Sequence, residues 1–176
     1  QVPQSVIDAM MHVYTNSNAN THGQFVTSQE TDQLIEHTRN QVAALLGAEG
    51  GHTISFGANM TSLNFVLANA ITKSLQPGDE ILITQLDHEA NRGPWLNQRR
   101  HGIVVREVLL EEDGSLDYAD LEKKISEKTR VIAIGLASNI FGTVNEIDRV
   151  RQLAYEVGAL LVVDGVHFLP HLLTDI

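Results

Sequence analysis

Short apolar runs alternate with longer segments of helical apolar spacing from residue 52 onward. An unbroken apolar run of a few residues is typical of a strand covered on both faces, as in a parallel sheet. Two parallel strands in succession need a crossover connection, and a helix usually provides it. The alternation therefore predicts an α/β domain with three layers, in which a mostly parallel sheet lies between flanking helices.

The expected elements follow from these runs and from the turn residues between them. We expect strands at residues 52–56, 80–84, 103–108, 130–135 and 160–163. Helices are expected after the turn at residues 57–61, from 87 to 102, over 118–125 and from about 146 to 157. Asp117, three residues before Asp120, resembles a capping arrangement for the third of these helices.

The first fifty residues have a helical pattern instead. Apolar residues at helical spacing begin at Val6, and a polar stretch over 16–23 is rich in turn-forming residues. Ser28 is expected to be the N-cap of a long helix that ends at Gly47. We expect residues 1–50 to form a helical segment that packs on the outside of the sheet domain, which covers residues 51–176.

Composition narrows the class of protein. Hydrophobic residues make up 43% of the chain and charged residues 19%, which indicates a globular protein rather than a disordered one. The formal net charge of -10 argues against a nucleic-acid partner, and the absence of cysteine excludes disulfides and thiol chemistry. No apolar run approaches the roughly 20 residues that span a bilayer, and no signal peptide is recognisable. We expect a cytoplasmic protein without a membrane partner.

Asp164 directly follows the apolar run 160–163, at the expected carboxyl end of a buried strand. Open α/β sheets bind their ligands at that edge. Gly165 permits a sharp turn, and His167 comes three residues after Asp164. A carboxylate in this position is placed to meet a cationic group of a ligand. The alternative is that Asp164 only caps the next turn.

Polar residues follow other expected strands in the same way. The stretch GANMT at 57–61 opens a helix after a glycine, so its free N–H groups and the helix dipole are suited to a phosphate. It is neither a Walker loop nor a dinucleotide fingerprint, and many strand-to-helix turns contain glycine. His88 is suited to lie flat against a planar ligand or to cap its helix. Asn139 is suited to donate to a ligand oxygen or to form a turn.

A phosphate cradle, a flat ring, an amide and a carboxylate together describe a site for a phosphorylated, cationic aromatic ring. Pyridoxal phosphate fits this description. A carboxylate beside the ring nitrogen of this cofactor keeps that nitrogen protonated, so that the ring can draw electrons from a substrate carbanion.

Four sequence blocks, in this order, resemble fold-type I pyridoxal-phosphate enzymes of the class V aminotransferase superfamily, in particular the cysteine desulfurase-like branch. The blocks are GANMTSLNFVLA, LDHEANRGPW, ASNIFGTVNEI and VDGVHFLPH, and the stretch NANTH at 18–22 resembles that branch's N-terminal active-site loop. The resemblance implies the large domain of a PLP-dependent transferase-like fold, an amino-acid substrate and a homodimer. Kynureninase-like, epimerase-like and aminotransferase chemistries stay open within the superfamily.

The resemblance also implies roles for single residues. Ala58, Asn59 and Met60 would lie where the family binds the cofactor phosphate. His88 would stack on the pyridine ring, and Asp164 would pair with the protonated ring nitrogen, which makes these two the expected catalytic residues. The remaining cofactor-binding positions are Asn139, near the phenolic oxygen, and His167, where relatives often carry glutamine.

The family's Schiff-base lysine lies one strand beyond the segment that carries Asp164. The lysines of this chain all precede Asp164; they are Lys73, Lys123, Lys124 and Lys128. The family's small domain, its substrate-carboxylate arginine and the catalytic cysteine of true desulfurases also belong to its C-terminal region. We therefore expect the chain to be an inactive fragment of the large domain, with Lys123 and Lys124 facing solvent.

Other constellations carry less weight. His167 and His171 would chelate a metal only on a regular helix, and Pro170 lies between them without an evident third ligand, so no metal site is expected. Ser138 with Asp164 and His167 suggests a hydrolase triad, but no serine lies on a nucleophile elbow. The alternative to an enzyme is a non-catalytic binding or scaffold module that keeps the fold.

Overall fold

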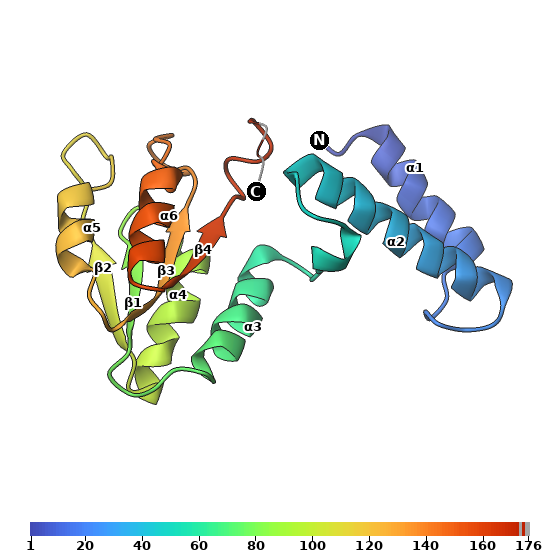
Figure 1. The fold of residues 1–176 in the computed structure, drawn as a ribbon. Helices are drawn as coiled ribbons and strands as arrows, with labels where there is room; N and C mark the ends of the chain where they lie inside the picture. The colour runs from blue at the N-terminus through green and yellow to red at the C-terminus, as the bar shows by residue number, and fades with distance from the viewer. Residues whose placement is uncertain (173, 175–176) are drawn as a thin grey trace. The chain divides into compact units, whose positions relative to one another are not determined.

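The computed structural model describes residues 1–172 and residue 174. The chain forms two compact units, Gln1–Phe56 and Gly57–Leu172. We call them the N-terminal unit and the sheet unit. The first is helical, and the second contains the sheet (Figure 1).

The N-terminal unit consists of two α-helices and two short helical turns. Helix α1 (Gln4–His12) continues into a π-helical turn, η1 (Val13–Ser17), and α2 (Val26–Leu46) precedes a 3-10 turn, η2 (Gly51–Thr53). Helix α2 ends as expected, at Gly47, whose φ of 67° is in the left-handed region that glycine tolerates.

Ser28 is not an N-cap, which corrects the sequence-based expectation. Helix α2 begins two residues earlier, and Ser28 is buried inside its first turn. Its hydroxyl donates to the carbonyl of Asn20 at 2.6 Å and accepts the N–H of Gly23 at 2.7 Å. Ser28 therefore fastens the preceding loop onto the helix, which is a tertiary contact that spacing along the chain does not reveal.

The strand expected at residues 52–56 is wrong. Its first residues belong to η2, where Thr53 N–H donates to the Gly50 carbonyl at 3.0 Å and Ile54 N–H to the Gly51 carbonyl at 3.1 Å. Two consecutive glycines lower the cost of such a tight turn, and a strand forms only where a neighbouring strand supplies a hydrogen-bonded ladder. In the part of the chain that the structure describes, the sheet has four strands instead of the expected five.

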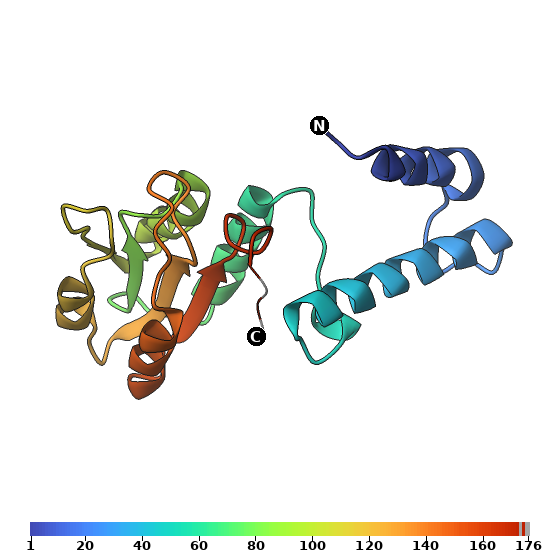
Figure 2. The ribbon, with the colours of Figure 1, turned by 90° about the horizontal axis from the view of Figure 1, so that it is seen from above.

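The four strands are parallel, in the spatial order β2-β1-β3-β4. They are β1 (Glu80–Thr84), β2 (Val104–Val108), β3 (Thr129–Gly135) and β4 (Leu160–Asp164). Their bounds differ from the expected ones by one residue at most. This result confirms the parallel sheet, with β2 and β4 as its edge strands (Figure 2).

One helix precedes each strand of the sheet unit, and three of these helices begin at a side-chain cap. The helices are α3 (Met60–Thr72), α4 (Glu89–Leu96) with the 3-10 turn η3 (Asn97–His101), α5 (Tyr118–Lys124) and α6 (Ile147–Glu156). Asn59, His88 and Asp117 each accept a backbone N–H in the first turn of the helix that they precede. The capping role expected for Asp117 is therefore confirmed.

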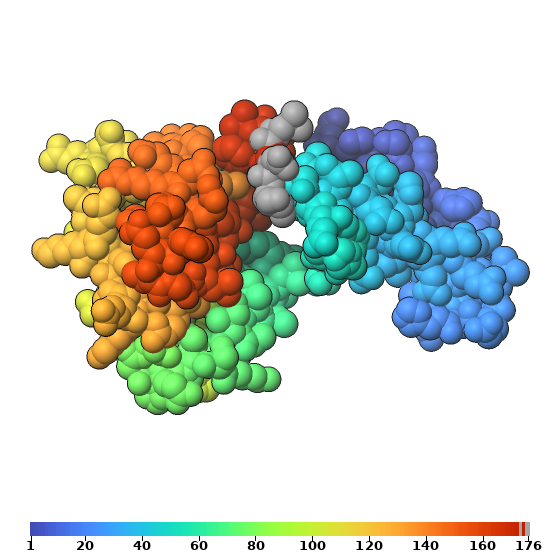
Figure 3. All heavy atoms as spheres, in the orientation of Figure 1, coloured from blue at the N-terminus to red at the C-terminus, as the bar shows by residue number. Residues whose placement is uncertain are grey.

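The core lies on the two faces of the sheet, because side chains alternate along each strand. Ile81 and Ile83 of β1 pack with Ala68 of α3 and Trp95 of α4 on one face. Leu82, between them in sequence, packs on the other face in a cluster that includes α5 and α6. The sheet is thus the middle of three layers, and α6 and α5 cover its near face in the space-filling view (Figure 3).

Lys124 does not face solvent, contrary to expectation. It is half-buried, and its ammonium group donates to Asp120 at 2.6 Å and to the Glu107 carbonyl at 2.5 Å. Lys123 is exposed as expected.

In the described part of the chain, no helix combines the length and the hydropathy that crossing a membrane requires.

Candidate functional site

Three strands bring polar residues to one edge of the sheet, because parallel strands end on the same side. β1 leads into Asp87 and His88, β3 into Ser138 and Asn139, and β4 ends at Asp164. Gly135 and Asp164 are register partners at the ends of β3 and β4, and the Leu136 N–H donates to the Asp164 carbonyl at 2.8 Å. The expected site residues from these strands therefore gather at the carboxyl edge.

Asp164 is half-buried, and one of its carboxylate oxygens serves the turn that follows. Oδ1 accepts the N–H of Val166 at 2.9 Å. The capping role that the sequence left open is therefore present. It engages one oxygen and is compatible with a contact from the other oxygen to a cationic ligand.

The rings of His88 and His167 are neighbours, with centroids 6.5 Å apart and planes tilted by 56°. His88 is also the N-cap of α4, since its Nδ1 accepts the Ala90 N–H at 3.1 Å. Nδ1 acts as an acceptor there, which assigns the ring proton of neutral His88 to Nε2. Both histidines are exposed, so the ring faces are accessible to a planar ligand.

The start of α3 is the place where the sequence predicts a phosphate cradle. Asn59 caps the helix by accepting the Ser62 N–H at 2.8 Å, and the other N–H groups of a first turn lack intrahelical acceptors. A Cβ on Gly57 would lie 2.4 Å from Leu63 Cδ2, so a larger residue at this position would require the Leu63 side chain to move. Ala58 and Asn59 are exposed, and Met60 is half-buried.

Asn64 ties this cradle to the helix that His88 begins. Its buried side-chain amide donates to the Ala90 carbonyl at 3.0 Å and to Asn91 Oδ1 at 2.9 Å. The first turn of α4 is thereby held beside the second turn of α3. Ala58, Asn59 and Met60 thus precede a helix that is bonded directly to the turn that carries His88.

The turn after β3 contains Ser138 and Asn139 and lines a hollow of about 390 Å³ together with His167 and His171. Ser138 is buried, and its hydroxyl oxygen accepts the N–H groups of Ile140 and Phe141 at 3.2 Å each. Ser138 is therefore a turn residue, which argues against the triad. Asn139 is exposed at the hollow.

Asp87 belongs to the same edge but was not among the expected site residues. Its carboxylate accepts hydrogen bonds from Thr84, Gly135 and Asn91. Burial raises the pKa of Asp87, and the nearby charge of Asp164 acts in the same direction, against the effect of these three bonds. The signal that could have revealed it is its position in the turn after a buried strand, three residues beyond Thr84.

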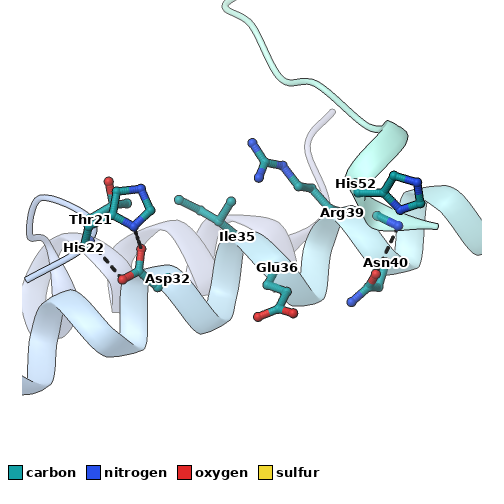
Figure 4. Close-up of a pocket in the computed structure, with 9 residues that line it drawn as sticks. Thr21, His22, Asp32, Ile35, Glu36, Arg39, Asn40 and His52 are labelled. Carbon is teal, nitrogen blue, oxygen red and sulfur yellow. Dashed lines mark hydrogen bonds and ion pairs between the residues drawn. The ribbon is translucent and has the colours of Figure 1, made fainter.

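A second hollow, of about 590 Å³, lies within the N-terminal unit (Figure 4). It is lined by Thr21 and His22 from the stretch NANTH, by residues of α2 and by His52. Asp32 of α2 accepts the His22 N–H at 2.9 Å and lies 3.6 Å from His22 Nδ1. The loop that resembles an active-site loop is thus fastened to α2 at Asp32.

The residues at the carboxyl edge of the sheet unit fit pyridoxal phosphate by their chemistry. The start of α3 offers N–H groups to an anion, two exposed imidazoles offer ring faces, and the strand-end carboxylate of Asp164 has an oxygen outside its turn contact. Among the described residues, no group of three or more His, Asp or Glu side chains is arranged to hold a metal ion. The roles of the single residues remain predictions.

Comparison with known proteins agrees with this chemistry. The family model for aminotransferase class V matches residues 1–176. A cysteine desulfurase of Pectobacterium atrosepticum is 34% identical over 179 residues, and a probable cysteine desulfurase of Streptomyces coelicolor is 36% identical over 184 residues. Both matches cover 100% of this chain and 44% of the relative, so the chain spans less than half the length of these proteins.

Solved structures give the same result for the fold. The cysteine desulfurase CsdA from Escherichia coli matches with a TM-score of 0.86 and 31% identity, over 98% of this chain and 44% of that chain. The apo cysteine desulfurase from Thermococcus onnurineus matches with a TM-score of 0.89 and 28% identity, over 97% of this chain and 43% of that chain. The chain belongs to the class V aminotransferase family of pyridoxal-phosphate-dependent proteins, in its cysteine desulfurase-like branch.

Proposed function

We propose that the carboxyl edge of the sheet unit binds pyridoxal phosphate, as part of an enzyme that acts on an amino acid in the manner of a cysteine desulfurase. The observation that carries this proposal is the meeting of two histidine rings and a strand-end carboxylate at one edge of a parallel sheet. The names of the relatives support cysteine as the substrate.

Each group of side chains has a distinct part in this proposal. The first-turn N–H groups around Ala58, Asn59 and Met60 hold the phosphate, because the helix dipole favours an anion at that end. The ring of His88 lies against the face of the cofactor ring. Asn139 and His167 serve the oxygen-bearing side of the cofactor ring.

Asp164 holds the proton on the ring nitrogen. Its half-buried carboxylate is an anion at the end of a strand, and an anion beside a heteroaromatic nitrogen favours the protonated form of that nitrogen. When bound, pyridoxal phosphate supplies an electron sink that stabilises negative charge on the substrate. The task of Asp164 is to keep that sink electron-poor.

The lysines of this chain are poorly placed to anchor the cofactor, so we expect the 176-residue chain to lack turnover. Lys73 caps the end of α3, and Lys128 directly precedes β3, which places both toward the amino ends of the strands. Lys124 is paired with Asp120, and Lys123 is exposed on the same short helix. We infer that a lysine in a further part of the protein serves this role.

We also propose a homodimer and a cytoplasmic location for the whole enzyme. The dimer is proposed from the membership in a family for which the sequence resemblance implies a homodimer. Sedimentation velocity of the whole protein over a range of concentrations tests the dimer.

The test of the proposed site is an absorbance titration of the chain with pyridoxal phosphate. Its variants are Asp164→Ala and His88→Ala, with the exposed residues Asp148→Ala and His37→Ala as matched controls. We expect saturable binding that each site variant weakens about tenfold or more, the effect of one lost charged or stacking contact. Borohydride treatment is expected to leave no covalently retained cofactor.

Two results would overturn the site assignment. One is an absence of saturable binding by the chain. The other is an affinity that neither site variant changes relative to the controls. Full desulfurase turnover by the 176-residue chain would contradict the expected inactivity, and a longer reading frame without a suitably placed lysine would favour the scaffold alternative.

A further inference from the structure

Asp87 forms a junction between three elements at the carboxyl edge of the sheet. Its Oδ2 accepts the Thr84 hydroxyl at 2.5 Å, from the last residue of β1. Its Oδ1 accepts the Gly135 N–H at 2.6 Å, from the last residue of β3, and the Asn91 side-chain amide at 3.2 Å, from α4. One carboxylate therefore links β1, β3 and the first turn of α4.

The turn that carries His88 is closed at both ends by these contacts. The Asn91 side-chain amide donates to Asp87, and the Asn91 N–H donates to the His88 carbonyl at 2.8 Å. His88 lies between these two residues, with its Nδ1 bonded to the Ala90 N–H. The direction of the imidazole ring is consequently set by a turn whose anchor is Asp87.

Gly135 makes the contact with Asp87 possible. A Cβ built on Gly135 would lie 2.8 Å from Asp87 Oδ1, closer than carbon and oxygen atoms approach without a bond. Gly135 is also the register partner of Asp164. Gly135 therefore contacts both acids: its N–H donates to Asp87, and its backbone pairs with that of Asp164. The backbone of Gly135 thus determines how the two acids are placed relative to each other at the edge of the sheet.

The chemistry of Asp87 is unusual for a turn residue. It is half-buried, both of its oxygens are used within the protein, and burial raises its pKa. A carboxylate that only closed a turn at the surface would avoid this cost of desolvation. Its contacts with three separate elements favour a role in the geometry of the site.

We propose that Asp87 is a positioning residue, which holds the ring of His88 in register with Asp164 through its junction with Thr84, Gly135 and Asn91. This inference rests on the proposed function, since it assigns a geometric task within the same cofactor site. Asp87 itself makes no contact with the ligand in this arrangement. Its effect on cofactor binding passes through His88.

The experiment compares Asp87→Ala, Asp87→Asn and Thr84→Val with the exposed control Asp113→Asn. The first readout is the imidazole NMR signal of His88 without cofactor, assigned by its loss in His88→Ala. The second is the dissociation constant for pyridoxal phosphate, measured in the wild-type and His88→Ala backgrounds. The fluorescence of the buried Trp95 reports whether each variant keeps the core of the sheet unit.

We expect Asp87→Ala to shift the His88 imidazole signals and to weaken cofactor binding about tenfold, with an unchanged Trp95 spectrum. Asp87→Asn keeps an acceptor for Gly135 and can donate to the Thr84 hydroxyl, so its effects should be smaller. Thr84→Val removes one of the three bonds and should shift the same imidazole signals. In the His88→Ala background, Asp87→Ala should add little to the loss of affinity.

Either of two outcomes would overturn the positioning role. One is a set of His88 signals that stay unchanged in both Asp87→Ala and Thr84→Val. The other is a loss of affinity from Asp87→Ala that is equally large in the His88→Ala background. If the wild-type chain binds no cofactor, the proposed function fails, while the imidazole signals still decide whether Asp87 positions His88.

Discussion

Gly135 and Asp164 lie side by side at the ends of β3 and β4, and the chain continues from Gly135 with an N–H bond from Leu136 to the Asp164 carbonyl at 2.8 Å. On its other side, Gly135 donates its own N–H to Asp87 at 2.6 Å. A single glycine thus connects the two acidic residues of the candidate site. Its lack of a side chain is what permits the close approach.

Gly135→Ala is expected to destabilise the protein by about 1–3 kcal/mol, the usual cost of forcing a methyl group into a packed position. The new Cβ would lie 2.8 Å from Asp87 Oδ1, which is pinned by its other bonds. Urea unfolding measures the loss. In an Asp87→Ala background the added cost should be smaller, and strictly additive effects of the two substitutions would contradict this explanation.

Asn64→Leu is expected to cost about 1–3 kcal/mol of stability, because it leaves buried partners without their donor. The substitution keeps the number and branching of the side-chain heavy atoms but removes the bonds to the Ala90 carbonyl and to Asn91. Urea unfolding is the measurement, with the exposed Gln152→Ala on α6 as control. A cofactor affinity that also falls would support the connection between the start of α3 and the turn of His88. Stability equal to that of the control would argue against these bonds.

Ser28→Ala is expected to loosen the loop at residues 18–25. The buried hydroxyl bonds both the Asn20 carbonyl and the Gly23 N–H, so its removal leaves two backbone groups without a partner. Hydrogen exchange of the Gly23 amide should become faster, while exchange in the sheet unit stays the same. Ser5→Ala, in the exposed helix α1, is the control. Unchanged exchange at Gly23 would show that Ser28 does not hold the loop.

Glu80 is expected to make stability depend on pH in the acid range. Burial tends to raise the pKa of Glu80, but hydrogen bonds from Arg106 at 2.7 Å and Ser126 at 2.8 Å, with the charges of Arg106 and Lys128, lower it below the ordinary 4.5. The ionised form is therefore favoured in the folded protein. Its contribution is present above pH 4.5 and is lost as the pH falls through the lower pKa of the folded state.

The measurement compares wild type with Glu80→Gln by urea unfolding from pH 7 down to the acid transition. The difference in unfolding free energy should be constant near neutral pH and should shrink as the pH falls below 4.5. Asp148→Asn, which changes an exposed carboxylate, serves as control. A difference for Glu80→Gln that does not vary with pH would contradict the expected ionisation.

Local patterns in the sequence determined the fold class and most of the elements. Apolar runs such as 80–84 and 160–163 identify strands because burial on both faces selects for unbroken hydrophobicity, and the structure confirms both. The caps at Asp117 and Gly47 follow equally from residue type and spacing. The gathering of His88 and Asp164 at one edge was also predictable, because parallel strands share the direction in which they end.

Only the tertiary structure decided which of several possible hydrogen-bond partners certain segments and side chains take. The segment 52–56 has strand-like residues but adopts a local 3-10 turn at its start, Ser28 bonds a loop instead of capping a helix, and Lys124 is bonded to Asp120 and to the Glu107 carbonyl. Asp87 is held at the site by a hydrogen bond from the N–H of Gly135, 48 residues away. Asp87 and Gly135 are brought together by the crossovers of the sheet, and the spacing of residues along the chain does not reveal that contact.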